Sequence, residues 1–313
     1  MKQRFISKRK KKKTVKLKFL FFACIFIYSL YFTFSYLLKS NLKVDDKVLV
    51  QLMLNDTYKN NLNIFSTIID TIKKTKVEEK LLMTSYYKLD TKKNQKDAVK
   101  TLNTTENNDY QIYIYNTHQT EEYAPNTFLE QQVKPTVMMS SYIMQDVFNK
   151  NNYKTLVEER RIKDILNENN WKYYRSYDAS RIYLNDVKEK NKSIKYFIDV
   201  HRDSLPKERT TVSINDKSYA KMIFLLGKEN PNYQENLEFI TKINNKVVEK
   251  YPNLSKGIYQ KEGAGVNGVY NQDNSKYTIL VEIGGPDNTT DEVLNTTLAF
   301  CECFMEVINS NEG

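Results

Sequence analysis

An uncharged run of twenty residues, FLFFACIFIYSLYFTFSYLL (19–38), directly follows a basic tail at the start of the sequence. At about 1.5 Å per residue, a helix of that length spans the roughly 30 Å hydrocarbon core of a membrane. Residues 1–18 hold ten Lys or Arg residues and no acidic residue, and such flanks stay in the cytoplasm. We therefore predict a cytoplasmic tail (1–18), a single transmembrane helix (19–38) in the cell membrane, and an extracytoplasmic remainder.

A cleaved signal peptide is the alternative interpretation of the same segment. The apolar region of a signal peptide usually spans about 7–15 residues and is followed by a small-residue cleavage pattern. The run here is longer, and no such pattern follows in LLKSNLKVDD. We therefore favour a retained anchor over a cleaved leader.

The charge of the chain argues against a nucleic-acid partner. The formal net charge is +10, from 48 basic and 38 acidic residues, and the ten basic residues of the tail account for the whole excess. The part of the chain after residue 18 is therefore neutral and offers no basic face for nucleic acid. Of the three cysteines, Cys24 lies in the apolar run. Cys301 and Cys303 lie two residues apart in a predicted helix, where they read as small core residues.

Composition divides the remainder into two parts. Residues 39–109 contain two helix-like apolar patterns and then a polar stretch (88–109), so we predict an extracytoplasmic helical stalk and linker. From residue 110 strands alternate with helices. The expected strands are 110–116, 195–200 and 277–283, with a hairpin of 210–214 and 220–227 around Asn215–Asp216. The expected helices lie near 138–150, 156–169, 178–191, 232–250 and 289–308. This alternation predicts an α/β domain (110–313) with a mixed, largely parallel sheet flanked by helices, in which the hairpin makes the sheet mixed.

The positions of the histidines are the most informative feature of this domain. The chain has two histidines, and His118 and His201 each follow a predicted apolar strand directly. Glu121 comes three residues after His118, and the last strand brings Glu282 into a Gly-Gly turn. Carboxyl ends of parallel strands share one edge of a sheet. Two His and one Glu form a known ligand set for catalytic zinc, and a separate carboxylate then serves as the base.

Each of these residues could instead have a purely structural role. An H-x-x-E pattern is common, and a histidine at a strand end is often only a hydrogen-bonded core or surface residue. The convergence of both histidines favours ligands. Glu122 competes with Glu121, although the H-x-x-E spacing favours Glu121. Glu282 could instead be the buried partner of an arginine. No G-x-S-x-G or Walker motif occurs, and the GAGVNG stretch (263–268) lacks the Lys of a phosphate loop, so it reads as a flap or turn.

Several segments in order carry a family resemblance. They lie between about residues 110 and 306 and read IYNTHQTEEY, YFIDVHRDS, TTVSINDKSYAKMIFLLGKENPNYQENL, KYPNLSKGIY, YNQD and LVEIGGPDNT. The sequence thereby resembles the sporulation cell-wall hydrolases called stage II sporulation protein P. Members of that family have a cytoplasmic tail, one transmembrane helix, a variable stalk and a catalytic domain similar to zinc-dependent N-acetylmuramoyl-L-alanine amidases. The segments predicted for this chain have the same order.

The resemblance implies a function. It implies hydrolysis of peptidoglycan at the amide between the lactyl group of muramic acid and the first L-alanine of the stem, and the family is also credited with an endopeptidase activity on cross-links. It further implies a role in engulfment of the forespore with the sporulation proteins D and M. Two alternatives stay open: a zinc carboxypeptidase-like peptidase that trims peptide stems, and an inert wall-binding scaffold.

The resemblance also implies roles for single residues. His118 and His201 would bind Zn2+, Glu282 would be the catalytic glutamate that takes the proton from water, and Glu121 would be the third ligand. Amidases typically take that ligand from a helix further along the chain, so Glu158 and Glu159 are alternatives. Two further residues of the HRD segment, Arg202 and Asp203, would bind substrate or support His201, unless they form an ordinary surface ion pair. The sequence departs from the family at Asn116, where members have a histidine, and in a short loop at 125–141.

Overall fold

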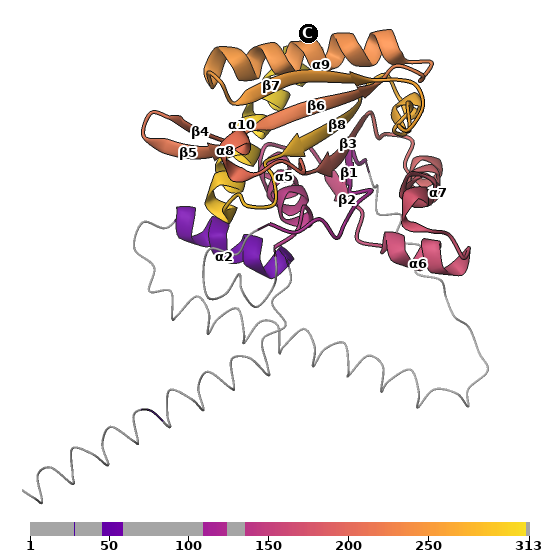
Figure 1. The fold of residues 1–313 in the computed structure, drawn as a ribbon, viewed down its shortest axis with the longest axis horizontal. Coiled ribbons are helices and arrows are strands. Elements are labelled where there is room, and N and C mark those ends of the chain that lie inside the picture. The colour runs from indigo at the N-terminus through magenta and orange to yellow at the C-terminus, as the bar shows by residue number, and fades with distance from the viewer. Residues whose placement is uncertain (1–27, 29–45, 59–108, 124–134, 311–313) are drawn as a thin grey trace, which may run out of the picture. The chain divides into compact units, whose positions relative to one another are not determined.

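The computed structural model describes residue 28 and residues 46–58, 109–123 and 135–310 (Figure 1). No helix within these ranges is long and apolar enough to cross a membrane. The predicted tail (1–18) and the predicted span (19–38), apart from Tyr28, lie outside the described residues. The membrane anchor therefore stays a prediction.

A six-stranded mixed sheet forms the centre of the described domain, in the order β2-β1-β3-β8-β6-β7. Four neighbouring strands are parallel: β2 (Thr155–Val157), β1 (Ile112–Tyr115), β3 (Tyr196–His201) and β8 (Thr278–Ile283). β6 (Met222–Gly227) runs antiparallel to β8, and β7 (Ser255–Lys261) runs parallel to β6. The predicted α/β class with a mixed, largely parallel sheet is confirmed.

The predicted hairpin is only partly correct. The strands around Asn215–Asp216 are β4 (Thr211–Ile214) and β5 (Lys217–Ala220), and they form a separate two-stranded sheet. Asn215 and Asp216 have φ angles of 49° and 60°, which a two-residue turn of this kind requires and which Asn and Asp tolerate. The apolar run that was assigned to the hairpin forms β6 of the main sheet instead. The main sheet is therefore mixed because of the direction of β6 and β7, and not because of the hairpin.

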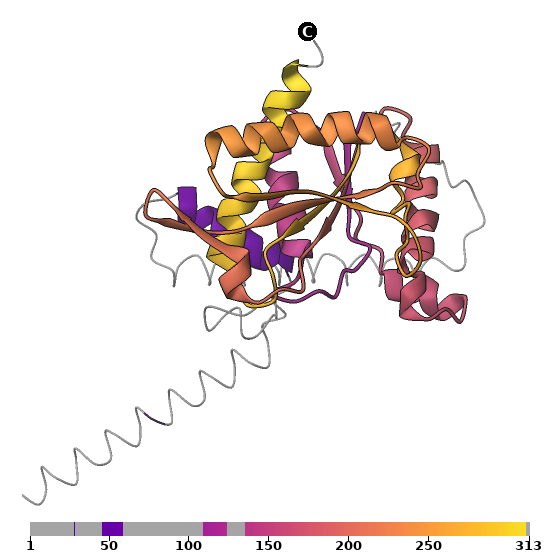
Figure 2. The ribbon, with the colours of Figure 1, turned by 45° about the horizontal axis from the view of Figure 1, so that its top comes forward.

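Helices cover both faces of the sheet (Figures 1 and 2). On one face, Tyr196 of β3 packs its ring against Phe239 and Phe304, which belong to α9 (Tyr233–Lys250) and α10 (Thr290–Ser310). α5 (Met138–Lys150) contacts α10 on the same side. On the other face, Leu184 of α7 (Ser176–Lys190) packs into a buried cluster with Phe197 of β3. Successive strand residues point to opposite faces, so Tyr196 and Phe197 define the two layers.

Four short helices connect the main elements of the described domain. The short elements are α6 (Ile162–Glu168), η1 (Tyr173–Arg175), α8 (Lys207–Thr210) and η2 (Gln272–Asn274).

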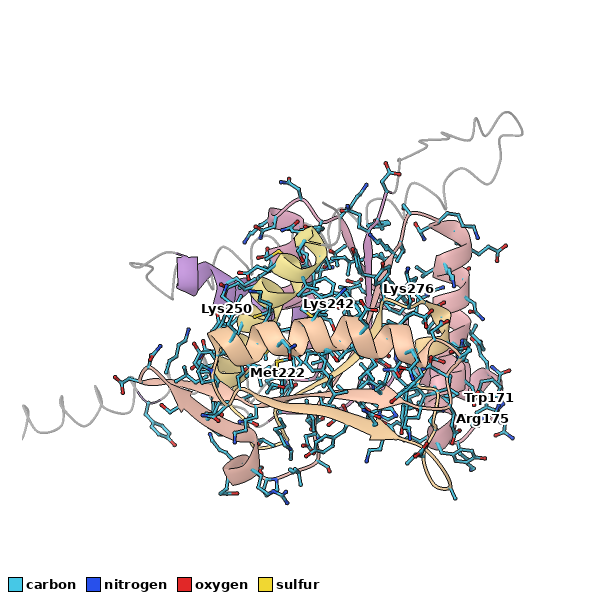
Figure 3. The ribbon with its side chains drawn as sticks, turned by 90° about the horizontal axis from the view of Figure 1, so that it is seen from above. Trp171, Arg175, Met222, Lys242, Lys250 and Lys276 are labelled. Atoms are coloured by element: carbon cyan, nitrogen blue, oxygen red, sulfur yellow. The ribbon has the colours of Figure 1, made fainter. Side chains whose placement is uncertain are left out.

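Side-chain contacts join the helices. In Figure 3, Lys250 lies at the end of α9, where its ammonium contacts the carboxylates of Glu302 and Glu306 on α10. Trp171 and Arg175 lie together beside α7, with the guanidinium 4.7 Å from the ring centroid. The two cysteines of α10, Cys301 and Cys303, are buried and unbonded, as the sequence predicted.

Part of the predicted stalk packs onto this domain. Residues Asp46–Tyr58 form helix α2, whose Leu49, Val50 and Leu54 are buried. The helix contacts α5, and it belongs to the same compact unit as the described residues of the α/β domain. The remaining stalk and linker residues, 59–108, lie outside the described residues.

Candidate metal centre

The carboxyl ends of β1 and β3 bring both histidines to one place. His118 lies three residues beyond β1, and His201 ends β3. Their rings meet edge to face with centroids 5.0 Å apart. Glu121 lies between them, with Oε1 at 3.5 Å from Nδ1 of His118 and Oε2 at 3.7 Å from Nδ1 of His201. Ligand atoms of the three residues all lie within 4.8 Å of one another, so together they could hold a metal ion.

The turn that carries His118 and Glu121 is held on two sides. The amide of Glu121 donates to the carbonyl of His118 (3.1 Å), which closes the turn. On one side, the Gln119 side chain donates to the carbonyl of Arg160 (2.9 Å) and accepts from the amide of Ile162 (2.9 Å). On the other side, the amide of Val137 donates to the carbonyl of Glu121 (3.0 Å). These contacts fix the spacing of the two candidate ligands.

Glu121 is held as a carboxylate that faces both imidazoles. Burial alone would raise its pKa, but the hydrogen bond from His118, the charge of His201 and the backbone amide of Arg202 together lower the pKa below its ordinary value. That amide donates to Oε2 at 3.0 Å. An ionised carboxylate next to two imidazole nitrogens is a donor set that suits zinc.

Asp199 contacts His201 on the ring nitrogen that faces away from Glu121. The sequence analysis did not identify this residue. Its carboxylate is fully buried, accepts from the amide (2.9 Å) and the hydroxyl (2.7 Å) of Thr117, and lies 3.0 Å from Nε2 of His201. The contact between the two is an ion pair, since Nε2 has no hydrogen-bond partner among the described residues. Burial lowers the pKa of His201, but the carboxylates of Asp199, Glu121 and Glu282 outweigh it and raise the pKa to about 9. The two-residue spacing of Asp199 and His201 in one strand was a usable signal.

Glu282 lies on β8, the strand next to β3, beside the cluster of His118, Glu121 and His201. It pairs with His201 in the parallel register of β8 and β3. Burial, and then the charges of Asp203 and Glu121, raise the pKa of Glu282, whereas His201 and Lys256 lower it, and the result is about 7. A carboxyl group with that pKa is suited to accept and return a proton near neutral pH.

Arg202 and Asp203 take part in the scaffold around the site. The Arg202 guanidinium donates from Nε to the carbonyl of Glu122 (2.7 Å) and from Nη1 to the carbonyl of Asp203 (3.0 Å). The Asp203 carboxylate accepts from Nζ of Lys256 at 2.8 Å, and both side chains are largely buried. The pair with Lys256 is therefore not an ordinary surface ion pair. Substrate binding by Arg202 or Asp203 stays a prediction.

The alternative third ligands lie elsewhere. Glu122 is exposed and pairs with Thr136 in an isolated β-bridge. Glu158 is buried, where it accepts from the Tyr113 hydroxyl (2.6 Å) and from the Arg160 guanidinium (2.7 Å). The exposed Glu159 pairs with Lys47 at 2.9 Å. Within the described residues His118, Glu121 and His201 are the only such cluster of three or more possible ligands.

Asn116 has a structural role next to the candidate site. Asn116 is buried and donates from Nδ2 to the carbonyl of Val200 (2.7 Å). Its Oδ1 accepts from the hydroxyl of Ser141 (2.7 Å) on α5. Asn116 therefore joins β1 to β3 and to α5, next to the two candidate ligands.

Three tyrosines form an aromatic wall over the histidines. Tyr173 stacks on His118 with centroids 5.1 Å apart, and Tyr177 stacks on His201 at 6.2 Å. Tyr270 meets Tyr177 edge to face at 5.3 Å. The Gly-rich stretch 263–268, just before Tyr270, contains a turn and is bonded to Glu229 at both ends. The Glu229 carboxylate accepts from the amide of Gly263 (2.8 Å), and the Glu229 amide donates to the carbonyl of Gly268 (2.9 Å).

Comparisons with known proteins identify relatives by sequence. The chain matches the family model of stage II sporulation protein P over residues 40–305. The stage II sporulation protein P of Bacillus subtilis (strain 168) is 35% identical over 202 residues, which is 63% of this chain and 50% of that relative. The chain therefore spans about half the length of that relative.

Solved structures show weaker likeness. The CwlD amidase from Clostridioides difficile, in complex with the GerS lipoprotein, has a TM-score of 0.40 and 11% identity over 64% of this chain and 99% of that one. An N-acetylmuramoyl-L-alanine amidase from Clostridium difficile 630 has a TM-score of 0.38 and 12% identity over 65% and 96%. A metallo-carboxypeptidase from Burkholderia cenocepacia has a TM-score of 0.37 and 8% identity over 64% and 57%.

Proposed function

Because this chain belongs to the stage II sporulation protein P family, we propose that it is a zinc-dependent peptidoglycan hydrolase that acts in sporulation. The proposed reaction is that of an N-acetylmuramoyl-L-alanine amidase, which hydrolyses the amide between the muramic acid lactyl group and the first L-alanine. An additional endopeptidase activity on stem cross-links belongs to the same proposal.

One observation carries this proposal: two imidazoles and a carboxylate lie within 4.8 Å of one another, with Glu282 on the adjacent strand. Three N/O donors suit a catalytic zinc site, which keeps a further position for water or substrate. The buried Asp199 carboxylate lies 3.0 Å from Nε2 of His201, where metal-binding histidines usually have a carboxylate or carbonyl partner. The donor set therefore fits Zn2+.

The residues of the site divide the work. His118, Glu121 and His201 would hold a zinc ion, which when bound would act as a Lewis acid on the scissile carbonyl and on the attacking water. Glu282 accepts the proton of the attacking water on its carboxylate and returns it to the nitrogen of the leaving amine. This proton transfer supplies the nucleophile without a serine or cysteine side chain.

A peptidase of the carboxypeptidase type is the second candidate. His118 and Glu121 lie in one tight turn with the H-x-x-E spacing that recurs in zinc peptidases. Such an enzyme would shorten peptide stems instead of removing them whole. A catalytically inert wall-binding scaffold is the third candidate, and it predicts no release of either product.

The location and the partners belong to the proposal as well. Residues 19–38 would anchor the chain in the cell membrane, with residues 1–18 in the cytoplasm and the α/β domain outside, facing its peptidoglycan substrate. The sporulation proteins D and M are proposed partners in engulfment.

Digestion of purified peptidoglycan by the full-length chain in mild detergent tests the proposal. An amidase releases intact stems with a new L-alanine amino terminus, whereas a peptidase releases shortened stems. The same preparation should contain about one zinc per chain, which a chelator removes together with the activity. Stoichiometric zinc in a His118→Ala, His201→Ala double variant would rule out this metal site. Absence of any released product would leave only the scaffold function.

A further inference from the structure

We propose that Asp46 of helix α2 is a positioning residue for the candidate metal centre, which acts through Thr136 on the segment that carries Glu121. The inference rests on the proposed function for the role of Glu121 as a ligand. It gives helix α2, which follows the predicted membrane span in the sequence, a part in completing the site.

The first step is the contact between Asp46 and Thr136. Oδ1 of Asp46 accepts from the Thr136 amide at 2.9 Å, and Oδ2 accepts from the Thr136 hydroxyl at 2.5 Å. Both bonds have an ionised acceptor and are partly buried, and such bonds are stronger than neutral ones. They join residues ninety positions apart in the sequence. Asp46 therefore fixes both the backbone and the side chain of Thr136.

The second step leads from Thr136 to Glu121. Thr136 pairs with Glu122 in an antiparallel bridge, and its neighbours bond on either side of that pair. The amide of Val137 donates to the carbonyl of Glu121 (3.0 Å), and the amide of Tyr123 donates to the carbonyl of Pro135 (2.7 Å). Segment 135–137 is thus the outer partner of segment 121–123.

The inner side of the same segment faces the site. The Glu121 carboxylate accepts from the amide of Arg202 at 3.0 Å and points to both histidines. The buried Tyr123 hydroxyl donates to the carbonyl of Ile283 (2.8 Å), the residue after Glu282. Segment 121–123 therefore lies between the metal centre and segment 135–137, and Asp46 secures segment 135–137 on its outer side.

Helix α2 is held in place by more than this contact. Leu49, Val50 and Leu54 are buried at 3%, 3% and 6% exposure, and the helix packs on α5. The family match begins at residue 40 and therefore includes α2. Release of α2 would remove both Asp46 bonds together, and segment 135–137 would lose its outer support.

Amide hydrogen exchange and zinc competition on the full-length chain in mild detergent test this role. In the metal-free protein, Asp46→Ala should speed exchange of the amides in 121–123 and 136–138 by about tenfold, since both bonds are lost. Zinc affinity measured against a chelator should fall by about 10–100-fold, the usual effect of losing an outer support of a ligand. Asp46→Asn keeps one acceptor oxygen for the Thr136 amide and should lie between Asp46→Ala and the parent.

Two further variants decide the outcome. Thr136→Val removes the hydroxyl bond to Asp46 and also the bond that the Met138 amide donates to the same hydroxyl (3.2 Å), so its effect is measured on the amides of 121–123. There it should give a smaller change in the same direction, which provides a second test if Asp46→Ala does not fold. Lys47→Gln is the matched control, because Lys47 lies next to Asp46 but pairs with the exposed Glu159. Parent-like exchange in both Asp46→Ala and Thr136→Val, or equal loss in Lys47→Gln, would overturn the proposal. A parent that binds no zinc would refute the proposed function, while exchange in the metal-free protein would still decide the role of Asp46.

Discussion

Glu282 of β8 lies directly opposite His201 of β3 in the parallel register of the sheet. Residues paired in this way point to the same face, so the carboxyl group lies beside the imidazole. Both residues belong to strands of the central sheet and not to surface loops, which limits their freedom to move. The proposed base and a proposed ligand are therefore held at a fixed spacing by backbone hydrogen bonds.

The first prediction follows from this division between base and ligand. Replacing Glu282 by Gln keeps the size of the side chain but removes the group that accepts the proton. Peptidoglycan amidase activity should fall by about 10²–10⁴-fold, the usual cost of losing a general base, while zinc stays bound. The assay is release of stem peptides alongside metal content. Activity near the parent level would show that another group takes the proton.

The second prediction concerns stability and pH in the metal-free protein. The pKa of Glu282 is about 7 in the folded chain against an ordinary 4.5, so the folded state binds this proton more tightly than the unfolded state. Stability from this group is therefore present at low pH and is lost as the pH rises from about 4.5 to 7. Glu282→Gln removes that loss and should raise the free energy of unfolding above pH 7 by up to about 3 kcal/mol.

Denaturant unfolding of the metal-free chains at pH 5 and pH 8 checks the sign. The stability of Glu282→Gln relative to the parent should be clearly higher at pH 8 than at pH 5. Equal differences at the two pH values would mean that the Glu282 carboxyl group has an ordinary pKa.

The third prediction separates the two adjacent glutamates. Glu121→Gln should weaken zinc retention, because an amide is a poorer ligand than a carboxylate, and added zinc should partly restore activity. Glu122→Gln is the matched control, since Glu122 is exposed and its contacts with Thr136 and Arg202 are made by the backbone. Tight zinc binding by Glu121→Gln, measured by competition with a chelator, would show that the third ligand is another residue.

The fourth prediction concerns Asp199, which touches no substrate in the proposed mechanism. Asp199→Asn removes the buried charge behind Nε2 of His201 and weakens the bonds to Thr117. Zinc affinity should fall by about 10–100-fold, and excess zinc should recover most of the activity. Unchanged zinc affinity in a folded Asp199→Asn chain would contradict a supporting role.

Long apolar patterns in the sequence predicted the fold well, and short or polar elements did not. The strand expected at 195–200 and the helix expected at 138–150 match β3 and α5. β2 has three residues and was hidden at the start of a predicted helix. β7, SKGIYQK, has no apolar run, because Tyr259 and Gln260 are exposed on an edge strand. Its place comes from pairing with β6, which local sequence does not reveal.

The same limit applies to the site. Strand ends predicted that His118, Glu121 and His201 would lie together, which is the arrangement in the structure, although their role as ligands stays a prediction. The contact of Asp46 with Thr136 had no local signal, since it joins segments that were assigned to a stalk and to a loop. Such long-range contacts depend on how α2 packs against α5.

The last prediction concerns topology, which follows from charge and apolar length alone. Ten basic residues precede an uncharged run of twenty, and moving that many positive charges across a membrane is unfavourable, so the tail should stay in the cytoplasm. Protease added to intact protoplasts should therefore digest the α/β domain and leave a short protected fragment that contains residues 1–38. The control is lysed protoplasts, in which that fragment should also lose its tail. A fully protected chain in intact protoplasts would place the domain in the cytoplasm, away from peptidoglycan, and would remove the substrate from the proposed function.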